Sequence, residues 1–249
     1  MQKLYCLLFS LLFVFTAHSQ VIRYTVLDVE SADREKFEKA IAEKTKTYNS
    51  KEGEGKGKVY TFSILSGKDA WNYARIAVQN SFGEFGNSQG SYNEGQRFYI
   101  KNVSPYFSSP GSYYMKAEDE ATYNPNDGTF QNDIDFRRVI LYSFKDSHRD
   151  NFWRFRMRMK KTMEKLGGNR MVVLRCISGC TDNKVMVRFH FKSLEEDEKF
   201  FDNFSNVRAT YDSIYGEDSF TEDVERMWNS LDSKRIWHER RRNELSSPF

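Results

Sequence analysis

Proline and cysteine are scarce in this sequence. Its 249 residues include only 4 prolines and 3 cysteines, whereas aromatic residues make up 16% of the chain. Disordered chains show the opposite balance, because they are rich in proline and poor in aromatic side chains. The composition therefore excludes a disordered protein, and the length suits one large domain or two small ones.

The sequence also lacks a marked excess of charge of one sign. The chain has 38 Lys and Arg residues against 35 Asp and Glu residues, which gives a formal net charge of +3. A nucleic-acid-binding protein more often shows a segregated basic stripe. Residues 239–242 are the densest basic stretch, and we interpret them as an exposed charged edge. We expect no nucleic-acid partner.

Motifs for metals and nucleotides are missing too. None of the 4 histidines stands in an H-x-x-x-H or H-x-E spacing, so we expect no mononuclear metal site. No Walker loop and no G-x-G-x-x-G sequence occurs. We predict no cofactor, with one exception left open, since a haem needs only a single axial histidine.

The N-terminus has no apolar run long enough to cross a bilayer. Residues 4–15 are apolar and follow Lys3, but they fall short of the ~20 residues of a membrane span. Ala17-His18-Ser19 forms a small-x-small cleavage site before Gln20, so the three regions of a signal peptide follow in order. We expect residues 1–19 to be removed and the mature protein to be secreted or periplasmic, without a membrane span. A buried N-terminal helix or an anchor is the alternative.

Cleavage leaves two cysteines, Cys176 and Cys180, at a turn between two predicted strands. An oxidising compartment permits a disulfide between them. Their C-x-x-x-C spacing is not the C-x-x-C of thiol redox centres. We predict a short disulfide that closes the turn, with a redox pair or two free thiols as the alternatives.

The main pattern is a duplication. A strand, a helix and two more strands follow one another in each half, and the halves align at Ser31 with Ser147 and at Gly67 with Gly179. The predicted strands are residues 22–29, 59–65, 73–79, 139–145, 171–177 and 184–192. Residues 152–159 alternate like a strand but also line one helical face. The first half has a helix at the matching place, from Ser31 to Tyr48, so we predict a helix at 151–166 as well.

Each half is expected to end with a further helix and strand. In the first half these are residues 93–106 and 112–123. In the second half Ser193-Leu-Glu-Glu196 forms a capping box that opens a helix, Ser219 opens another, and residues 235–244 form the last strand. A turn cluster at 124–128 separates the halves. We therefore divide the mature chain into repeats at 20–128 and 129–249.

Each repeat has the order β-α-β-β-α-β of a ferredoxin-like α+β unit. Two such antiparallel sheets facing each other would form an eight-stranded pseudo-dimeric barrel with helices outside. Over residues 22–244, this order of elements resembles the dimeric α+β barrel superfamily, in the tandem single-chain form of NIPSNAP-like proteins. The superfamily includes cofactor-independent monooxygenases, haem-degrading enzymes, haem peroxidases, isomerases and proteins without known chemistry, so the resemblance implies a fold and no single activity.

The strand at 184–192 indicates where a site could lie. Met186, Arg188 and His190 share one face of it, which we expect to line the barrel. On the strand at 73–79 we expect Ala74, Ile76 and Val78 to face the helices. Arg75 then points into the barrel as well. Arg175 has the parity of Val173 and Ile177, which we also assign to the inside.

The resulting hypothesis is a cationic cleft formed by Arg75, Arg175, Arg188 and His190. Arginine binds carboxylates with two parallel hydrogen bonds, and a histidine can accept a proton near neutral pH. The alternative is that these residues lie on a solvated sheet face or pair with Asp and Glu. The hypothesis requires Arg75 and Arg188 to point to the same side of the sheet.

Three functions stay open. The first is an exported barrel that binds a small, anionic molecule. The second is an enzyme like the cofactor-independent monooxygenases or the haem-linked members of the superfamily, using the cavity between the sheets. Haem-using relatives carry their axial histidine on a helix, and none of the predicted helices of the second half contains one. The third is a structural or protein-interaction module.

Overall fold

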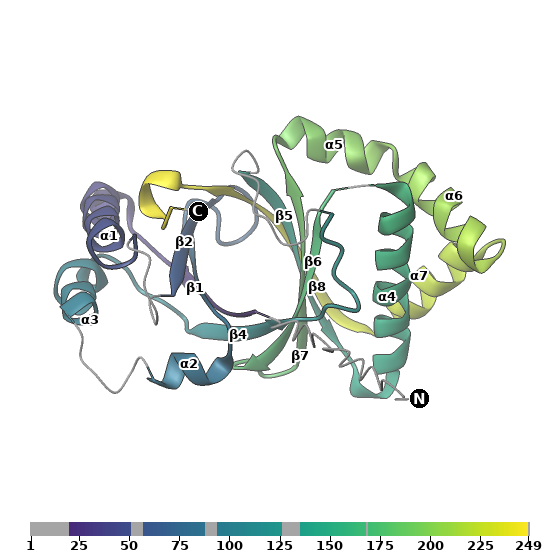
Figure 1. The fold of residues 1–249 in the computed structure, drawn as a ribbon, viewed down its shortest axis with the longest axis horizontal. Coiled ribbons are helices and arrows are strands. Elements are labelled where there is room, and N and C mark those ends of the chain that lie inside the picture. Colours follow the sequence, from purple (N-terminus) through teal and green to yellow (C-terminus); the bar gives the residue numbers. More distant parts are fainter. Residues whose placement is uncertain (1–19, 51–56, 88–93, 126–134, 168, 249) are drawn as a thin grey trace, which may run out of the picture.

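A computed structural model describes residues 20–50, 57–87, 94–125, 135–167 and 169–248. Eight antiparallel strands form a closed barrel in the order β1-β3-β2-β8-β5-β7-β6-β4, and helices lie on two opposite sides of it (Figure 1). The strands are β1 (Val21–Leu27), β2 (Lys58–Ile64), β3 (Tyr73–Gln79), β4 (Ser112–Ala117), β5 (Phe136–Phe144), β6 (Met171–Ser178), β7 (Asn183–Phe191) and β8 (Leu231–Arg241).

The two halves have the same topology. The neighbours β2-β3-β1-β4 of the first half correspond to β6-β7-β5-β8 of the second, and the halves meet at the pairs β2–β8 and β4–β6. The predicted α+β fold, with two facing ferredoxin-like sheets and outer helices, is confirmed. The predicted signal peptide at 1–19 and the predicted boundary after residue 128 lie outside the described residues.

The second half packs its helices against the sheet through a large apolar cluster. Its helices are α4 (Arg149–Leu166), α5 (Leu194–Asp202), α6 (Phe204–Tyr215) and α7 (Ser219–Asn229). Phe152 of α4 stacks on Phe144 of β5 with ring centroids 4.6 Å apart. Alternate residues of β7, such as Val187 and Phe189, contribute from the sheet. The helix predicted at 151–166 is confirmed, since its apolar face at 3.6-residue spacing is buried there.

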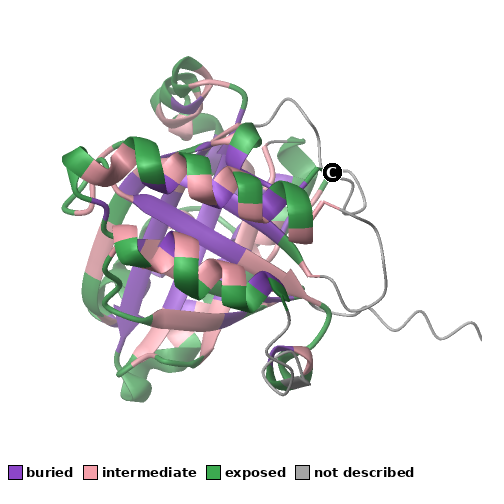
Figure 2. Ribbon diagram, turned by 90° about the vertical axis from the view of Figure 1, so that its left-hand side faces the viewer, coloured by how far each residue is buried: buried purple, intermediate pink, exposed green. Residues whose placement is uncertain are grey.

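The first half has a smaller apolar cluster outside its sheet. Helix α1 (Arg34–Tyr48) buries Phe37 and Ile41 against Leu27 and Tyr73. The predicted second helix is divided into α3 (Glu94–Phe98), a π-helical turn η2 (Tyr99–Val103) and a short 3₁₀ turn η3 (Ser104–Tyr106), and α2 (Phe82–Asn87) precedes them. Figure 2 looks onto this side, where the strands beneath the helices are largely buried.

The barrel interior contains a third apolar cluster, which includes Tyr24, Phe62, Ala74, Ile76, Val139, Leu141, Met186 and Trp237. Ala74 and Ile76 thus point into the barrel, so the orientation predicted for β3 is wrong. Both faces of this sheet are covered, and Tyr73 is as buried as Ala74. When both faces are buried, the alternation of apolar residues no longer identifies the inner one.

Other predicted boundaries also need correction. Strand β4 ends at Ala117, and Tyr123, the predicted end of this strand, makes only an isolated bridge to Met171. Residues 239–242 are not an exposed edge, because β8 lies between β2 and β5. Among the described residues, no helix combines the length and the apolar character that a membrane span requires.

The contribution of the predicted capping box to the stability of the protein can be measured. Ser193 Oγ accepts a hydrogen bond of 3.1 Å from the Glu196 N–H at the start of α5. Replacing such a cap with alanine costs ~1 kcal/mol. We expect Ser193→Ala to lower the free energy of unfolding by about this amount in urea titrations. Ser147→Ala is the matched control, because Ser147 precedes α4 without capping it, and its effect should stay within ~0.5 kcal/mol. Equal losses in both variants would contradict the assignment of the cap.

Candidate functional site

The structure separates the four residues of the predicted cationic cleft. Arg188 points into the barrel, where its guanidinium carbon lies 5.9 Å from the Tyr24 ring centroid. Arg75 points to the opposite side and donates to Thr45 of α1. Arg175 lies on the outer face as well, 39% exposed, in an ion pair with Glu118. The four-residue cleft is therefore absent, and only Arg188 and His190 share the barrel interior.

Cys176 and Cys180 form a disulfide at the turn after β6. The bond closes the turn beside the β4–β6 pair, where the register shifts between Tyr114 and Met115. It lies apart from Arg188 and His190, so it contributes no group to their surroundings.

The polar interior of the barrel is centred on Glu239. This side chain of β8 is 0% exposed and accepts hydrogen bonds of 2.6 Å from Tyr24 Oη and from Trp237 Nε1. Its other oxygen accepts from Arg137 Nε at 2.5 Å, and Arg137 stands directly opposite on β5. The Arg137 guanidinium also lies over the Phe62 ring, at 3.4 Å from its centroid. Glu239 has its hydrogen-bonding capacity occupied by the protein itself, so we assign it a positioning role.

Arg188 and His190 lie beside this network without a carboxylate of their own. His190 is on β7, the second neighbour of β5, where it pairs with Arg137. Arg188 is the inward-facing residue that precedes His190 on the same strand. They are 6% and 7% exposed. Arg188 Nη2 and His190 Nε2 make no hydrogen bond to any described residue, although Arg188 Nε contacts the Met186 sulfur at 3.3 Å.

The protonation of both residues follows from this burial. Burial, with the nearby Arg137, lowers the pKa of Arg188 to about 9, so its guanidinium is still charged at neutral pH. Burial, together with the positive charges of Arg170, Arg137 and Arg188, lowers the pKa of His190 well below 6.5. His190 is therefore a neutral imidazole at pH 7. The pair combines one uncompensated positive charge with one group that can either donate or accept a proton.

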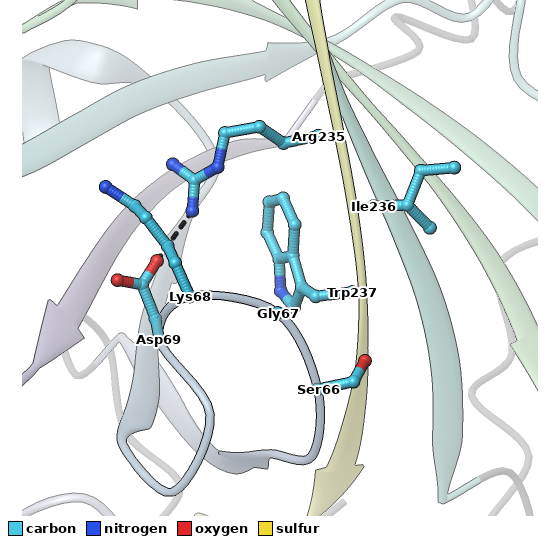
Figure 3. A pocket seen from close by; sticks show the side chains of 7 residues that line it. All are labelled: Ser66, Gly67, Lys68, Asp69, Arg235, Ile236 and Trp237. Atoms are coloured by element: carbon cyan, nitrogen blue, oxygen red, sulfur yellow. Dashed lines mark hydrogen bonds and ion pairs between the residues drawn. The ribbon is translucent and has the colours of Figure 1, made fainter.

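A pocket of about 350 Å³ lies beside the turn between β2 and β3 (Figure 3). It is lined by the turn Ser66–Asp69 and by residues 235–237 of β8. Asp69 and Arg235 form an ion pair of 2.7 Å across it, beside the indole ring of Trp237. Since the same indole donates to Glu239, the pocket and the polar interior share one side chain. No pattern in the sequence indicates this pocket, because its walls come from the two halves of the chain.

A series of hydrogen bonds on the outer face of β8 was not predicted from the sequence either. Ser66 Oγ lies 3.2 Å from His238 Nδ1, and His238 Nε2 lies 2.9 Å from Asp197 Oδ2. Arg138 holds the same carboxylate through two nitrogens. Ser66, His238 and Asp197 thus follow in the order of the nucleophile, base and acid of a catalytic triad. However, Ser66 Oγ also accepts the His238 N–H at 3.0 Å, so we interpret the series as a tie between the β2–β3 turn, β8 and α5.

The sequence contains one further motif of catalytic type. Residues 86–90 read Gly-Asn-Ser-Gln-Gly, which matches G-x-S-x-G. In hydrolases this motif lies on a sharp turn from a strand to a helix. Here the first two residues of the motif close helix α2, and Ser88 with the rest of it lies outside the described residues, so no catalytic role is assigned.

The described residues do not fit a haem or a metal ion. No group of three or more metal-ligating side chains occurs among them. His190 is the buried histidine with an unpartnered nitrogen, but Arg137, Arg170 and Arg188 surround it with positive charge. That charge disfavours a metal cation, and the space between α4 and its sheet is filled by aromatic rings. No axial ligand is therefore assigned.

Comparisons with known proteins identify the fold. No family model and no curated protein matches the sequence. Among solved structures, a monooxygenase-like protein from Lactobacillus acidophilus NCFM matches with a TM-score of 0.58 and 14% identity, over 92% of this chain and 96% of its own. An anthrone oxidase-like protein matches with a TM-score of 0.58 and 14% identity, over 90% and 92%.

A chlorite dismutase from Candidatus Nitrospira defluvii matches with a TM-score of 0.54 and 7% identity, again over 90% of this chain and 92% of that one. At these identities the similarity concerns the fold alone. It covers both halves of each chain, as the closed eight-stranded barrel requires. This protein thus has the fold of the dimeric α+β barrel superfamily, with both halves of the barrel supplied by one chain.

Proposed function

We propose that the chain binds a small acidic molecule inside the barrel, at Arg188 and His190. The observation that carries this proposal is the pair of buried nitrogens, Arg188 Nη2 and His190 Nε2, that lack a hydrogen-bonding partner. Buried polar groups in native proteins are almost always hydrogen-bonded, so an unpartnered pair needs an explanation. A ligand that accepts from both nitrogens provides one.

The charge balance favours an acid over a neutral ligand. The charge of Arg137 is offset by Glu239, whereas no described carboxylate hydrogen-bonds to Arg188. A bound carboxylate or phenolate would supply the missing negative charge. In a site shielded from water, such a contact is stronger than at the surface. The nearby rings of Tyr24 and Phe62 would suit the apolar body of the same molecule.

A second candidate function is proton abstraction from a weakly acidic substrate. It is favoured by the neutral state of His190, which leaves the imidazole free to accept a proton, next to a guanidinium that would stabilise the resulting anion. The monooxygenase-like and anthrone oxidase-like proteins of similar fold make this reaction class a reasonable test. Neither role requires a cofactor.

Arg188→Met tests the binding proposal. The substitution keeps the length of the side chain and removes an uncompensated buried charge, so we expect the ligand-free protein to gain ~1 kcal/mol of stability or more. The same change should weaken binding of a small aromatic acid, with benzoate as the probe, by at least ~30-fold, about 2 kcal/mol. Calorimetry and urea unfolding measure the two effects.

Arg175→Gln is the matched control, since that arginine is exposed and paired with Glu118. It should leave benzoate binding unchanged. Native mass spectrometry of the wild-type protein from its own host should also detect a bound acid that Arg188→Met loses. A wild type that carries no such mass, and that binds benzoate no more tightly than Arg188→Met, refutes the proposal.

His190→Gln tests the second candidate. With anthrone as the substrate, we expect oxygen consumption by the wild type at pH 7, in an oxygen electrode, and a loss of at least ~100-fold in the variant. Because the pKa of His190 is lowered, the wild-type rate should stay level from pH 8 to pH 6.5 and fall only in more acidic buffer. A wild type no faster than the uncatalysed reaction eliminates this candidate and leaves binding.

We further propose export of the mature chain to the periplasm or the medium, on the order of the three signal-peptide regions in residues 1–19. N-terminal sequencing of the protein from its own host should begin at Gln20. Recovery of the intact chain from the cytosol, with Met1 retained, would overturn this expectation.

A further inference from the structure

A second group of cations lies on the other side of the barrel wall, between the first sheet and α1. Arg75 of β3 is 8% exposed and donates three hydrogen bonds. Nη1 donates to Thr61 Oγ1 at 2.6 Å and to the Leu245 carbonyl at 3.3 Å, and Nη2 donates to Thr45 Oγ1 at 3.0 Å. All three acceptors are neutral, so the charge of this buried arginine has no counter-ion among the described residues.

Two further cations accompany Arg75. On β1, Thr25 pairs with Arg75 and Arg23 pairs with Ala77, so Arg23 is the diagonal neighbour of Arg75 on the same face. Side chains at such positions are within reach of each other when they are long. Lys44 precedes Thr45 on α1 and donates to the Asn49 side-chain carbonyl. Arg23 is exposed and Lys44 half-buried, so the group extends from the surface inward to Arg75.

These cations are close enough to act on one another electrostatically. Burial, followed by the charges of Arg75 and Arg23, lowers the pKa of Lys44 to about 7. Burial lowers the pKa of Arg75 to about 10, although Tyr99 of η2 opposes the shift. The groups that act on the cluster thus come from β1, β3, α1 and η2, and none of them is a carboxylate. A protein rarely buries positive charge in this way without a partner for it.

We propose that Arg23, Lys44 and Arg75 form a site for a small oxyanion, the phosphate or carboxylate group of a small molecule. An oxyanion would supply the counter-charge that the fold does not provide, and charge-assisted hydrogen bonds to guanidinium and ammonium groups are among the strongest in proteins. The site is separate from the one at Arg188 and His190, because the sheet wall lies between them. Figure 2 looks onto the side of the molecule that would admit the ligand.

This site predicts a measurable proton uptake. At pH 8 the amine of Lys44 is mostly neutral in the free protein, since its pKa is about 7. A bound anion favours the charged amine and raises this pKa. Binding should therefore take up close to one proton at pH 8. Titration calorimetry of the full chain at low ionic strength, in Tris and in HEPES, measures it from the difference in apparent enthalpy between the two buffers.

Inorganic phosphate and succinate serve as separate probes. Binding of either one supports the proposal, and the tighter of the two identifies the class of ligand. Lys44→Gln should abolish the proton uptake and weaken binding at least ~10-fold, and Arg23→Gln should weaken binding similarly while keeping the uptake. These two positions are chosen because an Arg75 variant would also lose three structural hydrogen bonds.

Two controls separate this site from the surface and from the barrel. Lys46→Gln changes an exposed lysine of the same helix and should have no effect. Arg188→Met should leave phosphate binding intact, so this proposal can fail or succeed independently of the proposed function. The proposal is overturned if neither anion binds below ~10 mM, or if Lys46→Gln weakens binding as much as Lys44→Gln does.

Discussion

The buried carboxylate of Glu239 is the contact on which the polar interior of the barrel depends. It receives a phenol from the first half, through Tyr24, and an indole and a guanidinium from the second, through Trp237 and Arg137. A buried ion pair adds little net stability, because desolvation cancels most of the attraction. Its value here is geometric. Only one arrangement of the two sheets brings Tyr24 to the same carboxylate as Arg137, so the contact specifies how the halves face each other.

The binding capacity of the interior follows from the polar groups that Glu239 does not pair with. Arg137 takes one oxygen of Glu239, and the other is shared by Tyr24 and Trp237. Arg188 lies two residues before His190 on β7, and its Nε contacts only the Met186 sulfur. The positive charges of Arg137 and Arg188 therefore outnumber the one negative charge of Glu239, and Arg170 adds a further positive charge at His190. Burial, reinforced by these positive charges, lowers the pKa of His190, so its imidazole is free to accept a proton at a pH where a histidine in water would be partly protonated.

The sequence predicted the fold well and the site only in part. The order of elements, both repeats and the inward face of β7 were readable, because Val185, Val187, Phe189 and Phe191 form one continuous apolar face. The faces of β3 and β6 were not readable, since apolar residues occupy both of them, and Arg75 and Arg175 were assigned to the wrong side as a result. Glu239 looked like part of an exposed edge. Closure of the barrel, which depends on residues more than a hundred positions away, turned that edge into an interior strand.

The two halves differ most in what covers their sheets. On the second half, aromatic side chains of α4, α5 and α6 fill the space against β5 and β7, and the buried Arg156 of α4 lies over the rings of Tyr142 and Phe155. On the first half, the broken helix around η2 covers less apolar surface, and Arg75 lies where the second half has its core. The duplicated topology is therefore covered by a larger apolar cluster on the second half than on the first. Arg75 lies on the outer face of β3 and Arg188 on the inner face of β7, because the strand period of two gives each strand one face toward the barrel interior and one toward the helices.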